Sequence, residues 1–245
     1  MTEVLPELYC DEHLVAVHKP TGLLVHRTGI DRNETRFAVQ MVRDQLGQHV
    51  YPVHRLDKGT SGVLLFARNP EIARQLVQQF AEQKIDKTYW AVVRGHPPEQ
   101  GRIDHPLDRI QDDYDKRTRT DAPAQSAVTD YRRLACVEIP VAVDRYPVSR
   151  YALLALSPLT GRRHQLRRHL KHIAHPIIGD VRYGKGSHNR YFREHLAAPR
   201  MLLACVRMQL SHPVTGATLV IEQPVDGSFR ALLQHWQWPV DVNNA

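Results

Sequence analysis

The stretch "YPVHRLDKGTSGVLLFAR", residues 51–68, joins two apolar runs through an arginine, an aspartate and a glycine-containing turn. The apolar pattern predicts a strand over residues 51–57 and another over residues 62–68. Asp57 then lies where a strand meets a turn. Aspartate is a common turn residue because its side chain bonds the downstream backbone, while glycine supplies positive φ. A structural role for Asp57 therefore stands beside a chemical one.

The segments around this stretch alternate between strand and helix patterns. Residues 13–20 and 87–95 have strand patterns, and residues 36–47 predict a helix that Gly47 ends. Asn69 followed by Pro70 is a good N-cap and N1 pair, so a second helix is expected to run to about residue 83. These local patterns predict the first half of the chain.

The second half of the chain also alternates between strand and helix patterns. Further expected elements are a strand and turn over 149–161, a helix from about Arg163, an irregular segment over 175–184, a hairpin over 200–224 and a last helix capped by Ser228. Strands in adjacent runs with single helices between them favour an α+β fold with a mixed, mainly antiparallel sheet flanked by helices. Residues 108–127 are rich in charge and predict a solvated loop. We expect one domain over residues 1–245.

Composition limits the class of partner. The chain has 33 Lys and Arg against 26 Asp and Glu, a net charge of +7, which favours a polyanionic partner. Three scattered cysteines without a CxxC pair fit a reducing compartment and argue against a disulfide framework. The first ten residues do not resemble a secretory signal, and the apolar runs are too short to cross a bilayer. We therefore expect a cytoplasmic protein that does not bind membranes, and no obligate protein partner is evident.

Residues 160–200 concentrate the positive charge. They contain ten Lys and Arg against two acidic residues, and helical spacing places Arg163, Arg167 and Lys171 on one face with Arg168 beside them. Like charges four residues apart repel each other. Contacts with phosphate groups would offset this repulsion, because binding them releases counterions. Arg163, Arg168 and Lys171 are therefore predicted to bind the phosphate groups of a polyanionic partner.

Six histidines lie in the same segment and raise the alternative of a metal site. Histidines 164, 169, 172 and 175 do not form the HxxxH pattern on one helix face with a nearby carboxylate. The surrounding cations would also disfavour a bound metal ion. No metal is predicted.

Four motifs in order carry a resemblance to a known family. The stretches are "LVAVHKPTGLLVH" (14–26), "HRLDKGTSGVLLFAR" (54–68), "KTYWAVVRG" (87–95) and "GRRHQLRRHLKHIAHPIIGDVRYG" (161–184). Together they resemble the RluA-like pseudouridine synthases over most of the chain. Other stretches, such as "AVTDYRRL" and "NRYFREHL", are most similar to the members that modify uridine 65 in the T stem of tRNA. We expect no separate N-terminal RNA-binding domain before the first motif.

The resemblance implies a role for each matching residue. It implies that Asp57 is the catalytic residue and that Arg167 is the cation that keeps the Asp57 carboxylate ionised. It implies that Arg55 enters the RNA stack in place of the flipped base, and that Tyr89 stacks on the target uracil. Alternatives remain open for two of them: Arg167 as one more phosphate contact, and Tyr89 as an ordinary strand aromatic.

The implied reaction breaks the N-glycosidic bond of uridine, turns the base and rejoins it through carbon. It includes no redox or phosphoryl-transfer step, so no cofactor is predicted. Asp57 attacks the ribose, attacks the ring or removes a ribose proton, and the sequence leaves these three paths open. Rival functions are a synthase of the same family acting on ribosomal RNA, an RNA-cleaving enzyme that uses histidines, and a non-catalytic RNA-binding module.

Overall fold

The computed structural model describes residues 4–27, 34–110 and 123–241. Contacts divide the chain into two compact units. Unit 1 consists of Met1–Asp86, Asp108–Gln125 and Arg207–Gln223, and unit 2 consists of Lys87–Leu107, Ser126–Val206 and Pro224–Ala245. Most of the predicted loop over 108–127 lies outside the described residues. The predicted single domain over residues 1–245 stays a prediction.

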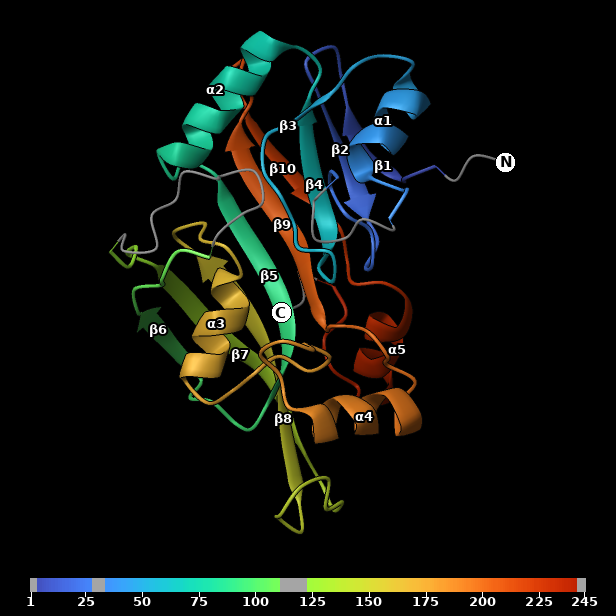
Figure 1. The fold of residues 1–245 in the computed structure, drawn as a ribbon, viewed down its shortest axis with the longest axis vertical. Coiled ribbons are helices and arrows are strands. Elements are labelled where there is room, and N and C mark those ends of the chain that lie inside the picture. The colour runs from blue at the N-terminus through green and yellow to red at the C-terminus, as the bar shows by residue number, and fades with distance from the viewer. Residues whose placement is uncertain (1–3, 28–33, 111–122, 242–245) are drawn as a thin grey trace. The chain divides into compact units, whose positions relative to one another are not determined.

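Unit 1 is built on short antiparallel strands. Its elements are β1 (Glu7–Cys10), β2 (Leu14–Lys19), α1 (Ala38–Leu46), β3 (Tyr51–Pro52), β4 (Ser61–Ala67), α2 (Pro70–Ala81) and β10 (Thr218–Glu222). Strand β2 pairs with β1 on one side and with β4 on the other, and β3 also pairs with β4 (Figure 1). All seven residues of β4 are buried, which explains its continuous apolar run.

Unit 2 has longer strands and three helices. Its elements are β5 (Asp86–Arg94), β6 (Gln100–Asp104), β7 (Val128–Ile139), β8 (Ser149–Pro158), α3 (Gln165–His172), α4 (Gly186–His195) and α5 (Gly227–His235). Within the unit, β5 pairs with β8, β8 with β7 and β7 with β6, all antiparallel. Strand β9 (Leu203–Ser211) begins in unit 2 and ends in unit 1, where it forms a hairpin with β10.

The core of unit 2 lies on one face of β5 and β8. Trp90 and Val92 of β5 belong to the same buried cluster as Tyr151 and Leu153 of β8. Helices α4 and α5 add Phe192, Phe229, Leu232 and Leu233 to this cluster. Alternation along β5 turns Tyr89 to the opposite face. The predicted class, α+β with a mainly antiparallel sheet flanked by helices, is confirmed.

Local sequence signals account for several boundaries. The Asn69 side chain accepts a hydrogen bond from the backbone N–H of Ile72 at 2.9 Å, and Pro70 is the first residue of α2. Gly47 ends α1 with φ at +64°, a conformation that glycine adopts without strain. The predicted cap of the last helix was wrong. Helix α5 begins at Gly227 after Asp226, so Ser228 lies inside its first turn.

Candidate active site

Asp57 lies in a loop between β3 and β4 of unit 1. The backbone N–H of Thr60 donates to the carbonyl oxygen of Asp57 at 3.0 Å, which closes a tight turn through Lys58 and Gly59. The Asp57 residue is half-buried. This turn fixes the backbone of Asp57, as the turn-residue interpretation predicted.

The predicted strand over residues 51–57 was wrong beyond Pro52. Only Tyr51 and Pro52 form a strand, and residues 53–57 follow an irregular path. Proline ends the ladder because it lacks an N–H group. The His54 ring then accepts the backbone N–H of Leu65 at 3.0 Å, so a side chain replaces the backbone pairing expected there. In a strand, Arg55 and Asp57 would share a face because they are two residues apart, but here both lie in one irregular loop.

A buried lysine supports the Asp57 turn. The Lys19 side chain is fully buried, and its Nζ atom donates to the carbonyl oxygens of Pro20, Leu23 and Lys58 at 2.9, 2.8 and 3.3 Å. The backbone N–H of Gly22 donates to the same Lys58 carbonyl at 2.7 Å. Lys19, Pro20 and Gly22 thus form a turn that is bonded to the Asp57 loop through the Lys58 carbonyl. Arg55, by contrast, is exposed.

Arg167 of α3 is buried in unit 2 and bound to a carboxylate. Its Nε atom donates to Asp180 Oδ2 at 2.7 Å, and one terminal nitrogen donates to Asp180 Oδ1 at 2.9 Å. The Arg167 side chain is 10% exposed and that of Asp180 is 1% exposed. Such a two-point pair fixes the plane of the guanidinium. Arg167 therefore lies on the inner side of α3, whereas Lys171, four residues further on, is exposed.

Asp180 is a residue that sequence reasoning missed. Besides Arg167, its carboxylate accepts the backbone N–H groups of Arg182 and Tyr183 at 2.9 and 3.0 Å. Burial opposes the charged form, but the hydrogen bonds from Arg167 and Tyr183 outweigh it and lower the pKa of Asp180. The preceding Gly179 was the available signal. Its φ is +80°, and a Cβ atom there would lie 2.0 Å from the carbonyl oxygen of Arg200.

The loop before α3 is fixed by Gln165. This buried side chain accepts hydrogen bonds from the Thr160 hydroxyl and the Arg162 N–H, and donates to the Val128 carbonyl and the Thr129 hydroxyl, all at 2.7–3.0 Å. Helix α3 begins only at Gln165, after His164 in a left-handed conformation. Arg163 thus precedes the helix, and its predicted position on the helix face was wrong.

Several cations of this region lie within cation–π distance of one tyrosine ring. The Tyr183 ring lies 5.1 Å from the guanidinium carbon of Arg167, 5.5 Å from that of Arg182 and 5.9 Å from Lys171 Nζ. These contacts, together with the Asp180 carboxylate, reduce the repulsion among like charges. The side chains of Arg168 and Lys171 are half-buried and exposed, respectively. Their predicted role in RNA binding stays a prediction.

The predicted site residues therefore fall into two groups. Arg55 and Asp57 share one loop of unit 1, whereas Tyr89, Arg163, Arg167, Arg168 and Lys171 belong to unit 2. Tyr89 lies on β5 and is 9% exposed. The predicted ion pair between Arg167 and Asp57 stays a prediction. Among the described residues, no group of three or more His, Cys, Asp or Glu side chains could hold a metal ion, and no helix is long and apolar enough to cross a membrane.

The sequence motifs agree with one protein family. A family model described as RNA pseudouridylate synthase matches residues 13–172, a range that contains all seven predicted site residues. The chain belongs to this family, whose members are isomerases that convert uridine to pseudouridine in RNA.

The most similar relatives include two bacterial enzymes called tRNA pseudouridine synthase C. The one from Vibrio cholerae is 48% identical over 236 residues, which cover 96% of this chain and 97% of the relative. The one from Pasteurella multocida is 48% identical over 239 residues and covers 97% of each chain. The structure of human RNA Pseudouridylate Synthase Domain Containing 4 has a TM-score of 0.70 at 25% identity, with 96% of this chain and 94% of that chain covered. These similarities support the same fold.

Proposed function

We propose that the protein converts a uridine of tRNA to pseudouridine, and that the target is uridine 65 in the T stem. The observation that carries this proposal is 48% identity, over nearly the full length of both chains, to enzymes called tRNA pseudouridine synthase C. The net charge of +7 suits an RNA substrate, and the protein would act in the cytoplasm without a cofactor.

Asp57 is the proposed catalytic residue. The turn that Lys19 supports holds the backbone of Asp57 in place. The carboxylate therefore needs little reorganisation during the reaction. A positioned carboxylate can supply the nucleophile or base that glycosidic cleavage requires. In this proposal Arg55 replaces the flipped base in the RNA stack, and Tyr89 stacks on the target uracil.

Arg167 is the proposed electrostatic partner of Asp57. Because Asp180 already holds two of its nitrogens, the guanidinium enters the reaction in a fixed orientation. A cation beside an active-site carboxylate keeps it ionised. The remaining basic residues of the segment, Arg163, Arg168 and Lys171, are assigned to the RNA backbone.

The experiment that tests this function is a comparison of pseudouridine positions in cells with and without the gene. Pseudouridine should disappear from position 65 of tRNA alone and return when the wild-type gene is restored. Loss at a ribosomal RNA position instead would favour the rival substrate. Unchanged pseudouridine in both RNA classes would contradict the proposal.

A further inference from the structure

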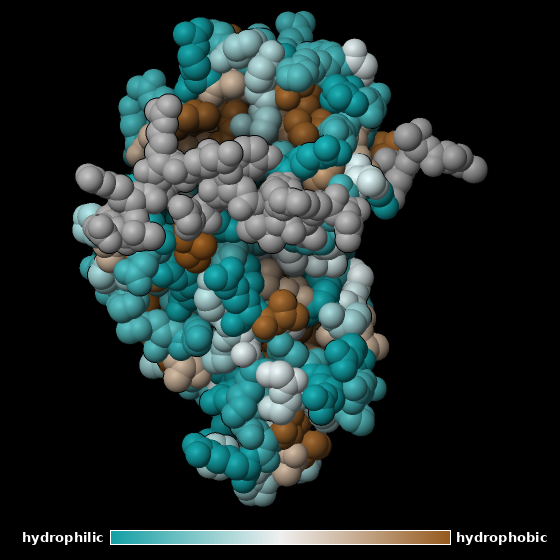
Figure 2. All heavy atoms as spheres, viewed as in Figure 1, coloured by the Kyte–Doolittle hydropathy of each residue, from teal (hydrophilic) through white to brown (hydrophobic). Residues whose placement is uncertain are grey.

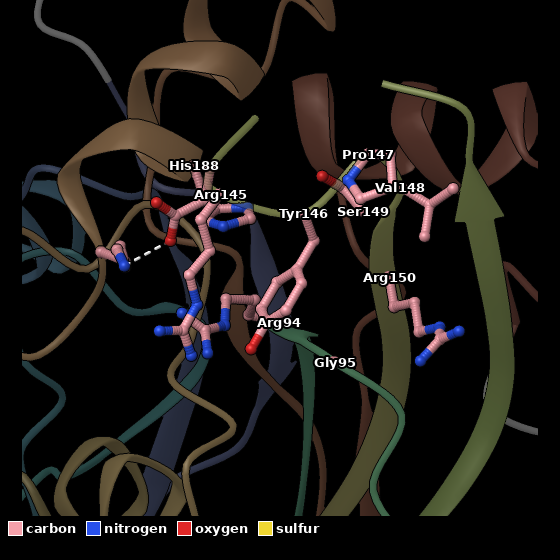
Figure 3. Close-up of a pocket in the computed structure, with 11 residues that line it drawn as sticks. Arg94, Gly95, Arg145, Tyr146, Pro147, Val148, Ser149, Arg150 and His188 are labelled. Carbon is pink, nitrogen blue, oxygen red and sulfur yellow. Dashed lines mark ion pairs between the residues drawn. The ribbon is translucent and has the colours of Figure 1, made fainter. Parts of the chain in front are cut away.

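A concave site in unit 2 is lined by none of the predicted site residues. It is a pocket of about 460 Å³ formed by the end of β5, the loop between β7 and β8, and the start of α4 (Figure 3). A pocket of this volume is in the range that holds a small organic group such as a nucleotide. None of the four family motifs accounts for the loop that forms its largest wall.

The pocket is positively charged. Its lining contains four cationic side chains and one carboxylate, a net charge of +3. Lys185 is paired with that carboxylate, Asp144, and Arg150 is paired with Glu138. Within the described residues, neither Arg94 nor Arg145 has a carboxylate at ion-pair distance. Two guanidinium groups are therefore available for an anion.

These two guanidinium groups point toward the same part of the pocket. Figure 3 shows the side chains of Arg94 and Arg145 converging beside the Tyr146 ring, while Arg150 lies farther along the wall. Arg94 extends from the end of β5 and is half-buried, and Arg145 comes from the β7–β8 loop and is exposed. Two arginines that converge from different elements match the oxygens of a phosphate group.

An exposed aromatic ring lies next to the two arginines. Tyr146 is 56% exposed, and the guanidinium carbon of Arg145 lies 4.7 Å from its ring centroid. Pro147 and Val148 continue the loop with apolar groups. Around the tip of the β7–β8 hairpin, Figure 2 shows hydrophilic residues flanking a small apolar group. An aromatic ring beside a phosphate-binding pair is the combination that binds a nucleotide with an unstacked base.

A buried histidine forms part of the inner wall. His188 is 4% exposed, and its Nδ1 atom lies 2.9 Å from the Tyr151 hydroxyl. Burial lowers the pKa of His188 to about 4, and the nearby Arg94 adds to the effect. His188 is therefore neutral at physiological pH, and the arginines at the pocket supply its positive charge.

We propose that this pocket binds one nucleotide of the RNA substrate, with its phosphate on Arg94 and Arg145 and its base on Tyr146. The proposal rests on the proposed function, because it takes the bound nucleotide to be part of the RNA. The exposure of Arg145 and Tyr146 favours a nucleotide in a chain over a small free ligand, which a pocket usually buries over most of its surface. The pocket would hold RNA at a point separate from the predicted site residues.

The test is equilibrium binding of unmodified tRNA transcript at several salt concentrations. Arg145→Gln should weaken binding and lower the slope of log K against log salt by roughly 0.7–0.9, the value for one phosphate contact. Tyr146→Ala should weaken binding by roughly 5- to 150-fold, the loss of one stacked base, and leave the slope unchanged. Arg193→Gln, which removes an exposed charge of α4 outside the pocket, is the matched control and should have little effect.

Two outcomes would overturn the proposal. One is wild-type affinity and slope for Arg145→Gln and Tyr146→Ala, whose exposed positions make misfolding a minor concern. The other is saturable binding of free uridine monophosphate that Arg145→Gln abolishes while tRNA binding stays intact. Pseudouridine formation by the wild-type protein is measured in parallel, so failure of the proposed function is seen separately from failure of the pocket.

Discussion

Arg167 and Arg102 each form a two-point pair with an aspartate, but in opposite environments. The pair of Arg167 with Asp180 is buried, whereas Arg102 and Asp130 lie on the exposed strands β6 and β7 with side chains 60% and 36% exposed. Water screens the exposed pair. Removal of one partner therefore leaves the other charge solvated by water and not buried. Removal of Asp180 would leave the Arg167 charge buried without its compensating carboxylate.

We therefore expect Asp180→Ala to lower the free energy of unfolding by about 3–5 kcal/mol, the usual cost of breaking a buried ion pair. The loss of acceptors for the N–H groups of Arg182 and Tyr183 adds to this effect. Asp130→Ala is the matched control and should have a much smaller effect. Urea unfolding followed by circular dichroism measures both, and equal losses would show that the Arg167 pair is as solvent-screened as the exposed one.

A second carboxylate gives unit 1 a dependence on pH. The Oδ1 atom of Asp11 accepts the N–H groups of His13 and Leu14, and its Oδ2 atom lies 2.8 Å from both the Tyr9 hydroxyl and His212 Nε2. Burial opposes ionisation, but the hydrogen bonds from Leu14 and His13 outweigh it and hold the pKa of Asp11 at about 2.

Because the folded pKa of Asp11 is depressed, its contribution is present above the unfolded pKa of about 4 and is lost as the pH falls toward 2. At pH 7, Asp11→Ala should lower the free energy of unfolding by about 1–3 kcal/mol through unsatisfied donors. The difference between the variant and the wild type should shrink between pH 4 and pH 2. Urea midpoints across this range test it, and a difference that stays constant would contradict the assignment.

At the scale of elements, local signals predicted some segments and not others. Helix α2 follows from the Asn69–Pro70 start and from apolar residues at helical spacing. Helix α4 has only His188 and Phe192 buried, so its sequence carries little periodicity. Strand β7 alternates weakly because Asp130 and Glu138 form ion pairs with arginines of the neighbouring strands. Such cross-strand pairs depend on register, which the local sequence does not contain.

The candidate site was also predictable only in part. Asp57, Arg55, Tyr89 and Arg167 were predicted from motifs, because a motif records the residue types that the chemistry needs, and their roles stay predictions. Asp180 and the bonds of Lys19 were not, since they depend on segments that meet only after folding.

The segment from Ile177 to Gly184 is the element most sensitive to a small change. Gly179 approaches the backbone of Arg200 so closely that no Cβ atom fits, and its positive φ disfavours any other residue. Gly179→Ala should therefore shift Asp180 and weaken its hold on Arg167, lowering the melting temperature by several degrees. Gly161→Ala, where no atom lies within 4 Å of the added carbon, is the control. Equal melting temperatures for the two variants would contradict this account.

At the scale of the whole molecule, residues 160–200 have less unpaired positive charge than their composition indicates. Of the ten cations between residues 160 and 200, at least four have carboxylate partners among the described residues: Arg167, Lys185, Arg193 and Arg200. The local excess of +8 therefore overstates the charge available to RNA, and part of it stabilises unit 2.

Replacing Arg163, Arg168 and Lys171 by glutamine should weaken tRNA binding and flatten its salt dependence. Each lost phosphate contact should lower the slope of log K against log salt by roughly 0.7–0.9. Arg74→Gln on the exposed surface of α2 is the control for a change in net charge alone. An unchanged slope in the triple variant would show that these side chains do not bind the RNA backbone.

The role of Arg167 is separated from that of a phosphate contact by kinetics. If Arg167 supports the charge of Asp57, Arg167→Gln should lower the single-turnover rate at saturating tRNA, with partial recovery at alkaline pH as the carboxylate ionises. A phosphate contact would instead raise KM and leave the saturating rate nearly intact. A wild-type saturating rate with a flat pH response would assign Arg167 to RNA binding.

The central claim is that the Asp57 carboxylate performs the isomerisation, and its most direct test is single-turnover pseudouridine formation by Asp57→Asn. Asparagine keeps the size and turn preference of the residue but removes its charge. We predict a folded protein that binds tRNA with wild-type affinity and forms no pseudouridine, while Asp44→Asn on the exposed face of α1 retains full activity. Substantial turnover by a folded Asp57→Asn protein would contradict the account.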